Sequence, residues 1–243
     1  MNVLKKVYLD GVARELLHTR RRILWNFKRK FGRVDHGIIE RYVSAEEIRK
    51  LHIGCGSNII NGWLNSDLFP VSSSILHLDA TEPFPFGDNE FNYVFSEHMI
   101  EHISYSQGLR MLSECYRILR EHGKIRISTP DLVFLIDVYK EEKSDSQNKY
   151  IQWATDEFIK YAPYSDDTFV INNFVRDWGH QFIYDEKTLQ ASMAKVGFKR
   201  ITRCELNESE EETLRNLENE NRMPEGFLRL ESFTLEGTKL SAS

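Results

Sequence analysis

The sequence predicts an α/β fold built on a mostly parallel sheet, and three observations support that prediction. Short apolar or β-branched runs recur along the chain, as at 51–53 and 91–95, and each ends at a polar residue or a glycine. Helical patterns separate several of these runs, and strands that alternate with helices favour a parallel sheet. The 243 residues, of which 41% are hydrophobic, suffice for one large domain with additions.

The strands are expected at 51–53, 63–66, 74–78, 91–95, 124–128, 198–205 and 233–236. The first runs directly into Gly54-Cys55-Gly56. Asp67 and Asp79 end the second and third strands, and Pro130 stops the fifth. In open α/β folds ligands bind at the end of the sheet where such strands finish.

Helices are expected between these strands. Residues 106–121 place apolar side chains on one face, Ser104 and Gln107 have the spacing of a capping box, and Gly123 stands where a C-terminal cap is expected. Other helices are expected to start at Ser44, to lie around 150–161, and to run from 185 to Gly197. Residues 208–222 are so highly charged that they predict a solvated helix.

Charge divides the chain unevenly. Residues 1–33 hold ten lysines and arginines against Asp10 and Glu15, about +8, so the rest carries about −13 of the net charge of −5. We expect a basic helical extension over 1–45 and a cofactor-binding domain over 46–243, with a substrate-side insertion at 131–175. The basic segment 1–33 either docks on the acidic body or contacts an anionic membrane surface. Nucleic acid is not an expected partner, because the body is acidic and shows no binding motif.

Cysteine use and hydropathy indicate the compartment. Cys55, Cys115 and Cys204 are odd in number and far apart, without CxxC or metal-finger spacing, which favours a reducing environment and argues against structural zinc. No apolar run reaches the ~18–20 residues that cross a bilayer, and no secretory signal is evident. We therefore expect a cytoplasmic protein, with peripheral contact at the inner membrane face if the basic segment binds lipid.

The glycine loop at 54–56 is the main functional signal. Glycines just after a strand permit a sharp turn and the close approach of a ligand, although many such pairs are only turns. A dinucleotide fingerprint needs a third glycine, which is missing, and Asp67 follows Gly54 by 13 positions where ~20 are expected. No phosphate-binding Gly-Lys-Ser/Thr follows either. These departures disfavour an NAD-dependent oxidoreductase and favour a nucleoside without phosphates, which S-adenosylmethionine (SAM) fits.

The acids at the strand ends extend this site. Asp67 is placed to accept hydrogen bonds from ribose hydroxyls, and Asp79, with Ala80 beside it, is placed to accept from the adenine amino group. Either residue could instead be a turn-forming aspartate. The full set of expected cofactor-binding residues is His52, Gly54, Cys55, Gly56, Asp67, Leu68, Asp79, Ala80 and Ser96.

From 52 to 131 the sequence resembles the class I SAM-dependent methyltransferase family. The glycine loop, Asp67, the segment 96–103 and the run 114–124, similar to E-x-x-R-x-L-x-x-G-G, carry the resemblance. Asn92 stands where Asp is usual, and His122 replaces the first of two glycines. The resemblance implies a Rossmann-like seven-stranded sheet with flanking helices, whose last strand is antiparallel, and SAM as cofactor.

A narrower resemblance concerns the acceptor. Residues 61–67 and 177–184 are similar to small bacterial methyltransferases associated with surface polysaccharide synthesis. This implies methyl transfer to a hydroxyl or amine of a sugar or sugar-linked intermediate. The alternative is a non-catalytic scaffold subunit with the same fold in a glycan-assembly complex.

Such an acceptor must lose a proton, and histidine is the usual base near neutral pH. His98 and His180 are the expected bases, and Glu101 would orient a histidine or line the pocket, whereas His102 is expected to pack as a helix residue. Asp131 and His180 could meet a metal, but their spacing is not diagnostic, so no metal site is predicted. One aromatic group would either contact a sugar ring or methylated ammonium, or form a small second core: Tyr161, Tyr164, Phe169, Phe174 and Trp178.

Overall fold

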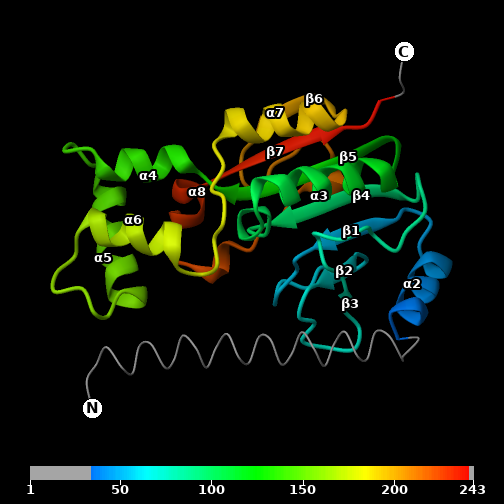
Figure 1. The fold of residues 1–243 in the computed structure, drawn as a ribbon, viewed down its shortest axis with the longest axis horizontal. Helices are drawn as coiled ribbons and strands as arrows, with labels where there is room; N and C mark the ends of the chain where they lie inside the picture. The colour runs from blue at the N-terminus through cyan, green and yellow to red at the C-terminus, as the bar shows by residue number, and fades with distance from the viewer. Residues whose placement is uncertain (1–33, 241–243) are drawn as a thin grey trace.

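The computed structural model describes residues 34–240 and shows a seven-stranded sheet with a helical lobe at one end (Figure 1). The strands are β1 (Lys50–Ile53), β2 (Leu64–Asp67), β3 (Leu76–His77), β4 (Phe91–Glu97), β5 (Leu119–Pro130), β6 (Lys199–Cys204) and β7 (Ser232–Thr238). Their order is β3-β2-β1-β4-β5-β7-β6. Strands β1 to β5 pair in parallel, and β7 runs antiparallel to both β5 and β6. The predicted Rossmann-like fold with an antiparallel last strand is therefore confirmed.

The helices are α2 (Val34–Ala45), α3 (Tyr105–Ile118), α4 (Leu132–Tyr139), α5 (Asp145–Phe158), α6 (Asp167–Arg176), α7 (Glu186–Val196) and α8 (Phe227–Glu231). Three single 3-10 turns are η1 (Ile100–His102), η2 (Glu212–Leu214) and η3 (Glu220–Arg222). Helices α3 and α7 pack on each other and on one face of the sheet. No helix in the described part of the chain is long and apolar enough to span a membrane.

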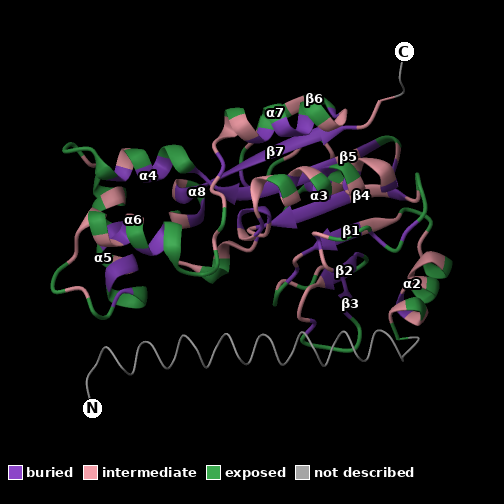
Figure 2. Cartoon of the chain, viewed as in Figure 1, coloured by how far each residue is buried: buried purple, intermediate pink, exposed green. Residues whose placement is uncertain are grey.

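The core follows from the alternation of side chains along the central strands. In β4, Phe91 and Val94 belong to the main core, whereas Phe95 points to the opposite face and packs with Trp63, Leu214 and Leu217. Figure 2 shows the central strands buried and the outer sides of the helices exposed. Burial of both faces explains why these strands read as nearly continuous apolar runs.

Helix α3 begins as predicted but ends early. Ser104 accepts from the backbone N–H of Gln107, whose side chain in turn accepts from the backbone N–H of Ser104, so the capping box is present. The helix ends at Ile118 because Leu119 already pairs with Phe91 in the sheet and is fully buried. Gly123 was predicted to cap this helix, but it lies within β5. His122 has a φ of +63°, a backbone conformation that favours glycine.

Helix α7 agrees with its sequence signals at both ends. The Asp185 side chain accepts from the backbone N–H of Thr188, and Gly197 closes the helix with a φ of +119°. This left-handed cap is the conformation for which glycine is preferred.

The insertion after the fifth strand forms a lobe with its own core. Helices α4, α5, α6 and α8 lie together at the end of the sheet (Figure 1). Phe134, Tyr150, Ile151, Val170 and Phe174 are among the buried side chains of this core. The one helix expected around 150–161 is α5, which starts earlier because Ser144 and Gln147 form a capping box. Helices α4 and α6 were not predicted, and the side chains of Asp131 and Asp166 cap them.

The charged segment 208–222 was predicted to be a solvated helix, and this prediction was wrong. The segment contains only the turns η2 and η3. Leu214 and Leu217 are buried against the sheet, and Glu218 forms a buried ion pair with Arg126. The segment thus covers the face of the sheet opposite α3 and α7, and its carboxylate serves a buried arginine rather than solvent.

The start of the described chain also differs from expectation. Ser44 does not begin a helix: it lies in the last turn of α2, and its hydroxyl donates to the carbonyl of Glu40. Asp35 in the same helix accepts from the backbone N–H of His77, which fastens α2 to β3. The predicted basic helix over the first 33 residues lies outside the described residues.

Candidate functional site

The glycine loop leaves β1 at the carboxyl edge of the sheet, next to β4. Gly54 and Gly56 have φ values of +71° and +51°. A Cβ atom on Gly54 would lie 2.4 Å from Cγ of Met99, whereas a Cβ on Gly56 would meet nothing within 4 Å. Gly54 thus permits close backbone packing, and Gly56 borders open space where a ligand can approach. No helix follows the loop: the chain runs from β1 to β2 without one.

Asp67 is fixed in place by the loop that it faces. Its Oδ2 accepts from the backbone N–H of Gly56 at 2.9 Å, and its Oδ1 accepts from that of Phe69 at 2.7 Å. Each carboxylate oxygen can accept a second hydrogen bond. The carboxylate is therefore oriented by protein and keeps one acceptor position per oxygen, which fits a ribose diol.

Asp79 and Ser96 offer two further polar groups at this edge. Both hydrogen bonds to the Asp79 carboxylate come from Thr81 and fall on Oδ1, so Oδ2 keeps its acceptor capacity. The Ser96 hydroxyl is buried at the end of β4 and finds no partner among the described residues. Such an orphaned group requires an explanation, and a bound ligand would supply one.

Most of the remaining residues that were expected to bind the cofactor are buried. His52 is 1% exposed, its Nδ1 lies 3.2 Å from Oδ1 of Asn65, and its ring packs on Phe95. Burial lowers the pKa of His52 to about 4, which keeps it neutral. Cys55 is buried, and burial raises the pKa of its thiol to about 12. Leu68 and Ala80 directly follow Asp67 and Asp79, and only Ala80 is buried.

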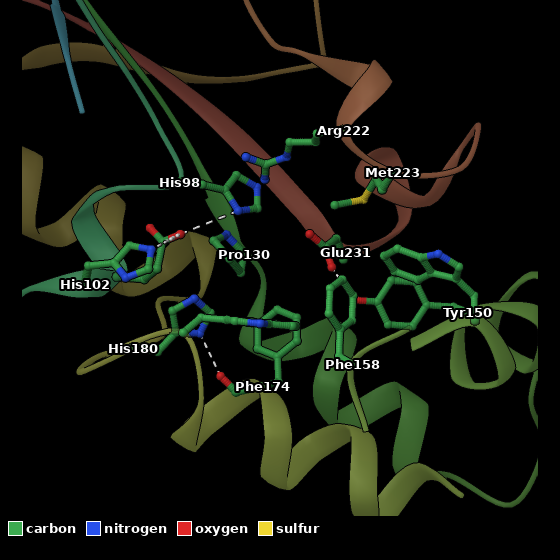
Figure 3. A pocket seen from close by; sticks show the side chains of 13 residues that line it. His98, His102, Pro130, Tyr150, Phe158, Phe174, His180, Arg222, Met223 and Glu231 are labelled. Atoms are coloured by element: carbon green, nitrogen blue, oxygen red, sulfur yellow. Dashed lines mark hydrogen bonds and ion pairs between the residues drawn. The ribbon is translucent and has the colours of Figure 1, made fainter. Parts of the chain in front are cut away.

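A second hollow lies beside the cofactor loop. Met99, whose side chain contacts Gly54, follows His98, and His98 lines a cavity of about 280 Å³ between the sheet edge and the helical lobe (Figure 3). Residues adjacent in the chain thus connect the loop with the cavity. The cavity is lined by His98, Glu101, His102, Pro130, Tyr150, Trp153, Phe158, Phe174, Trp178, His180, Arg222, Met223 and Glu231.

Three imidazoles meet in this cavity. His98 adopts a φ of +47°, and its Nε2 lies 2.8 Å from the Ser232 hydroxyl. The rings of His102 and His180 are 4.9 Å apart. His180 Nδ1 lies 2.6 Å from the carbonyl oxygen of Phe174 (Figure 3). A carbonyl only accepts, so Nδ1 carries the proton and Nε2 bears a lone pair. Burial lowers the pKa of all three histidines, to about 4 for His102, which favours neutral rings.

Carboxyl groups complete the polar side of the cavity. Glu101 is fully buried, its Oε2 accepts from the Thr129 hydroxyl, and its Oε1 faces His98 Nδ1 at 3.5 Å. Glu231 accepts from the Tyr150 hydroxyl. Burial raises the pKa of Glu101 to about 8 and that of Glu231 to about 7, and the positive charge of Arg222 opposes the rise in both.

The aromatic side chains form the opposite side. Trp178 packs edge-on against Phe158 and Phe174, with ring centroids 5.0 Å and 5.8 Å apart. Of the aromatic residues singled out from the sequence, Phe169 and Phe174 pack in the lobe core, Trp178 lines the cavity, and Tyr161 and Tyr164 are exposed. The second-core alternative is therefore confirmed for Phe169 and Phe174, and ligand contact stays a prediction for Trp178.

The structure brings His98, Glu101 and His180 together, as the sequence suggested. His102 was expected to be a packed helix residue but lines the cavity. The presence of His98 and His102 on either side of Glu101 in the sequence was the signal that could have indicated this. Arg222 and Glu231 had no such signal, because they come from segments with no recognisable motif. Asp131 caps α4 and does not line the cavity.

Comparison with known proteins agrees with this geometry. Residues 51–127 match the family model described as a methyltransferase domain. No curated protein sequence matches the chain. The match and the observed fold together support the assignment of this chain as a SAM-dependent methyltransferase, with S-adenosylmethionine as its cofactor.

Three solved structures with similar folds are compared with this chain by sequence identity, coverage and TM-score. A SAM-dependent methyltransferase from Archaeoglobus fulgidus is 18% identical, with 89% of this chain and 99% of that chain covered and a TM-score of 0.48. One from Mesorhizobium loti is 13% identical, with 79% and 91% covered and a TM-score of 0.47. Phosphoethanolamine N-methyltransferase 2 from Haemonchus contortus is 16% identical, with 85% and 52% covered and a TM-score of 0.43. The fold assignment itself rests on the strand order.

Proposed function

We propose that this protein transfers the methyl group of SAM to a hydroxyl, or an amine, of a sugar or sugar-linked acceptor bound in the cavity beside the glycine loop. The observation that carries the proposal is proximity: Met99 packs against Gly54 of the glycine loop, and the adjacent His98 lines the cavity. An acceptor in the cavity is thereby held next to the cofactor loop, which is what an in-line displacement requires.

The cavity has the groups that the transfer needs. When bound, SAM supplies an electrophilic methyl group, and the protein supplies position and electrostatics. The acceptor must lose its proton, and the lone pair on a neutral imidazole of His98 or His180 can take it. Glu101, 3.5 Å from His98 Nδ1, would orient that ring.

The lining also favours a sugar over an apolar acceptor. Trp178 and Phe158 present ring faces and edges on one side, while Glu101, Glu231 and Arg222 present polar groups on the other. A sugar ring has apolar C–H surfaces and polar hydroxyl groups, so it can satisfy both sides at once. This pattern, a few convergent polar groups in an aromatic pocket, is typical of small-molecule sites.

The test is a screen for release of S-adenosylhomocysteine with nucleotide sugars, free sugar phosphates and simple amines as acceptors. We expect turnover with at least one sugar-containing acceptor. His98→Ala and His180→Ala are expected to lower the rate by roughly 10²–10⁴-fold in the variant that removes the base, and His122→Ala, which changes an exposed histidine, should have no effect. Turnover confined to acceptors without a sugar would refute the proposed substrate class.

A further inference from the structure

We propose that Glu101, His102 and His180 bind one divalent transition-metal ion of the Zn²⁺, Co²⁺ and Fe²⁺ type at the wall of the acceptor cavity. One ligand atom from each residue can be chosen so that all three lie within 4.8 Å of one another. Two imidazoles and one carboxylate are a ligand set that such ions favour, with further positions open to water or substrate. The sequence predicted no metal site, because the spacing of Asp131 and His180 was not diagnostic.

The fold brings these ligands together from two segments. Glu101 and His102 lie in the 3-10 turn η1 directly after β4, and His180 lies in the loop between α6 and α7. The two segments are fastened by the backbone: the N–H groups of Gln181 and Phe182 both donate to the carbonyl of Glu101, and the Gln181 side chain donates to the carbonyl of His102. The approach of His180 to η1 is thus built into the fold.

A second observation points to a ligand at this place. Glu101 is fully buried, and its Oε1 has no hydrogen-bond partner among the described residues. This atom faces His98 Nδ1 at 3.5 Å and His102 Nε2 at 3.9 Å, beyond good hydrogen-bond range. A buried carboxylate oxygen without a partner is costly, and a cation bound there would satisfy it.

The outer contacts resemble those that orient metal ligands. His180 donates through Nδ1 to the carbonyl of Phe174, which leaves Nε2 as the ligand atom. Glu101 Oε2 is held by the Thr129 hydroxyl, which leaves Oε1 as the ligand atom. Histidine ligands commonly donate their second N–H to a carbonyl, and carboxylate ligands are commonly hydrogen-bonded.

Only a small closure is needed. Metal–nitrogen bonds of about 2.0–2.1 Å put two tetrahedral ligands about 3.4 Å apart, so from within 4.8 Å the widest pair must close by at most about 1.4 Å. His102 and His180 are both partly exposed, so their rings can turn without moving the sheet. Arg222 lines the same cavity, and Glu231 provides a nearby carboxyl group to balance its charge.

One consequence rests on the proposed function. If His180 is a ligand, His98 is the imidazole that remains to accept the proton of the acceptor. A metal-bound acceptor hydroxyl would also lose its proton more readily, because a bound cation stabilises the oxyanion.

The test is titration of the metal-free full chain with Co²⁺, followed by visible absorption, and with Zn²⁺, followed by calorimetry. We expect one ion per chain, with the dissociation constant raised at least tenfold in both His102→Ala and His180→Ala. His36→Ala and His122→Ala are the matched controls, because these exposed histidines also lie within 4 Å of a glutamate. They should bind as the wild type does.

His102→Ala and His180→Ala are checked by thermal unfolding. Both are expected to remain folded because the side chains they remove are partly exposed. Absence of binding by the wild type would overturn the proposal, as would wild-type affinity in either folded variant. The titration uses no SAM and no acceptor, so its failure is distinguishable from failure of the proposed methyl transfer.

Discussion

Arg126→Met is expected to lower the free energy of unfolding by about 3–5 kcal/mol, because it leaves two buried carboxylates without their counter-charge. Arg126 is fully buried in β5. Its Nε and Nη2 donate to the two oxygens of Glu218 at 2.6 Å and 3.1 Å, and its Nη1 donates to Glu236 at 2.6 Å. Urea unfolding of the two proteins measures the difference.

The matched control is Arg203→Met. Arg203 lies on the edge strand β6, and its exposed ion pair with Glu186 of α7 is lost in this variant. Pairs of this kind contribute about 0–1 kcal/mol. A loss below 1 kcal/mol in Arg126→Met would show that the buried cluster does not stabilise the fold as described. The cluster also holds the segment that carries Arg222 into the acceptor cavity, so the variant is expected to alter acceptor binding as well.

Gly54→Ala is expected to weaken SAM binding by at least about tenfold and to destabilise the protein by about 1–3 kcal/mol. The new Cβ would lie 2.4 Å from Cγ of Met99, at a φ of +71° that already strains alanine. Either Met99 or the glycine loop must move, and a movement of the loop would disturb the residues expected to bind SAM. Calorimetric titration with SAM and thermal unfolding measure the two effects.

Gly62→Ala separates backbone strain from the clash. Gly62 has a φ of +74°, but the nearest atom to its Cβ would be Lys50 Nζ at 3.5 Å. This variant should lose a little stability and keep its affinity for SAM. Equal affinities of the two variants would mean that the contact between Gly54 and Met99 does not shape the cofactor site.

The sequence predicted the central sheet well, because its signals are local. Apolar runs that end at Gly54, Asp67 and Asp79 identify strands and the edge where they finish, and side-chain caps at Ser104 and Asp185 identify two helix starts. The segment 208–222 could not be predicted in this way. Its charge pattern is that of a solvated helix, and only the distant Arg126 explains why Glu218 is buried instead.

The site divides along the same line. The residues of the glycine loop and its two aspartates are close to one another in sequence, so a cofactor-binding role could be predicted for them from spacing. The cavity lined by His98 and Arg222 gathers η1, the lobe helices and the segment before α8, which are far apart in the chain. His102 was therefore expected to pack in a helix, and Arg222 and Glu231 could not be anticipated from any local pattern.

Isothermal titration of SAM against the wild type and Asp67→Ala tests the central claim most directly. Asp67 is oriented by the N–H groups of Gly56 and Phe69 and keeps acceptor capacity for a ribose. We expect micromolar binding by the wild type and a loss of at least about tenfold in the variant, the effect of removing hydrogen bonds to a charged group. If the wild type does not bind SAM, the account of the cofactor site is contradicted, and a non-catalytic scaffold becomes the better explanation of the fold.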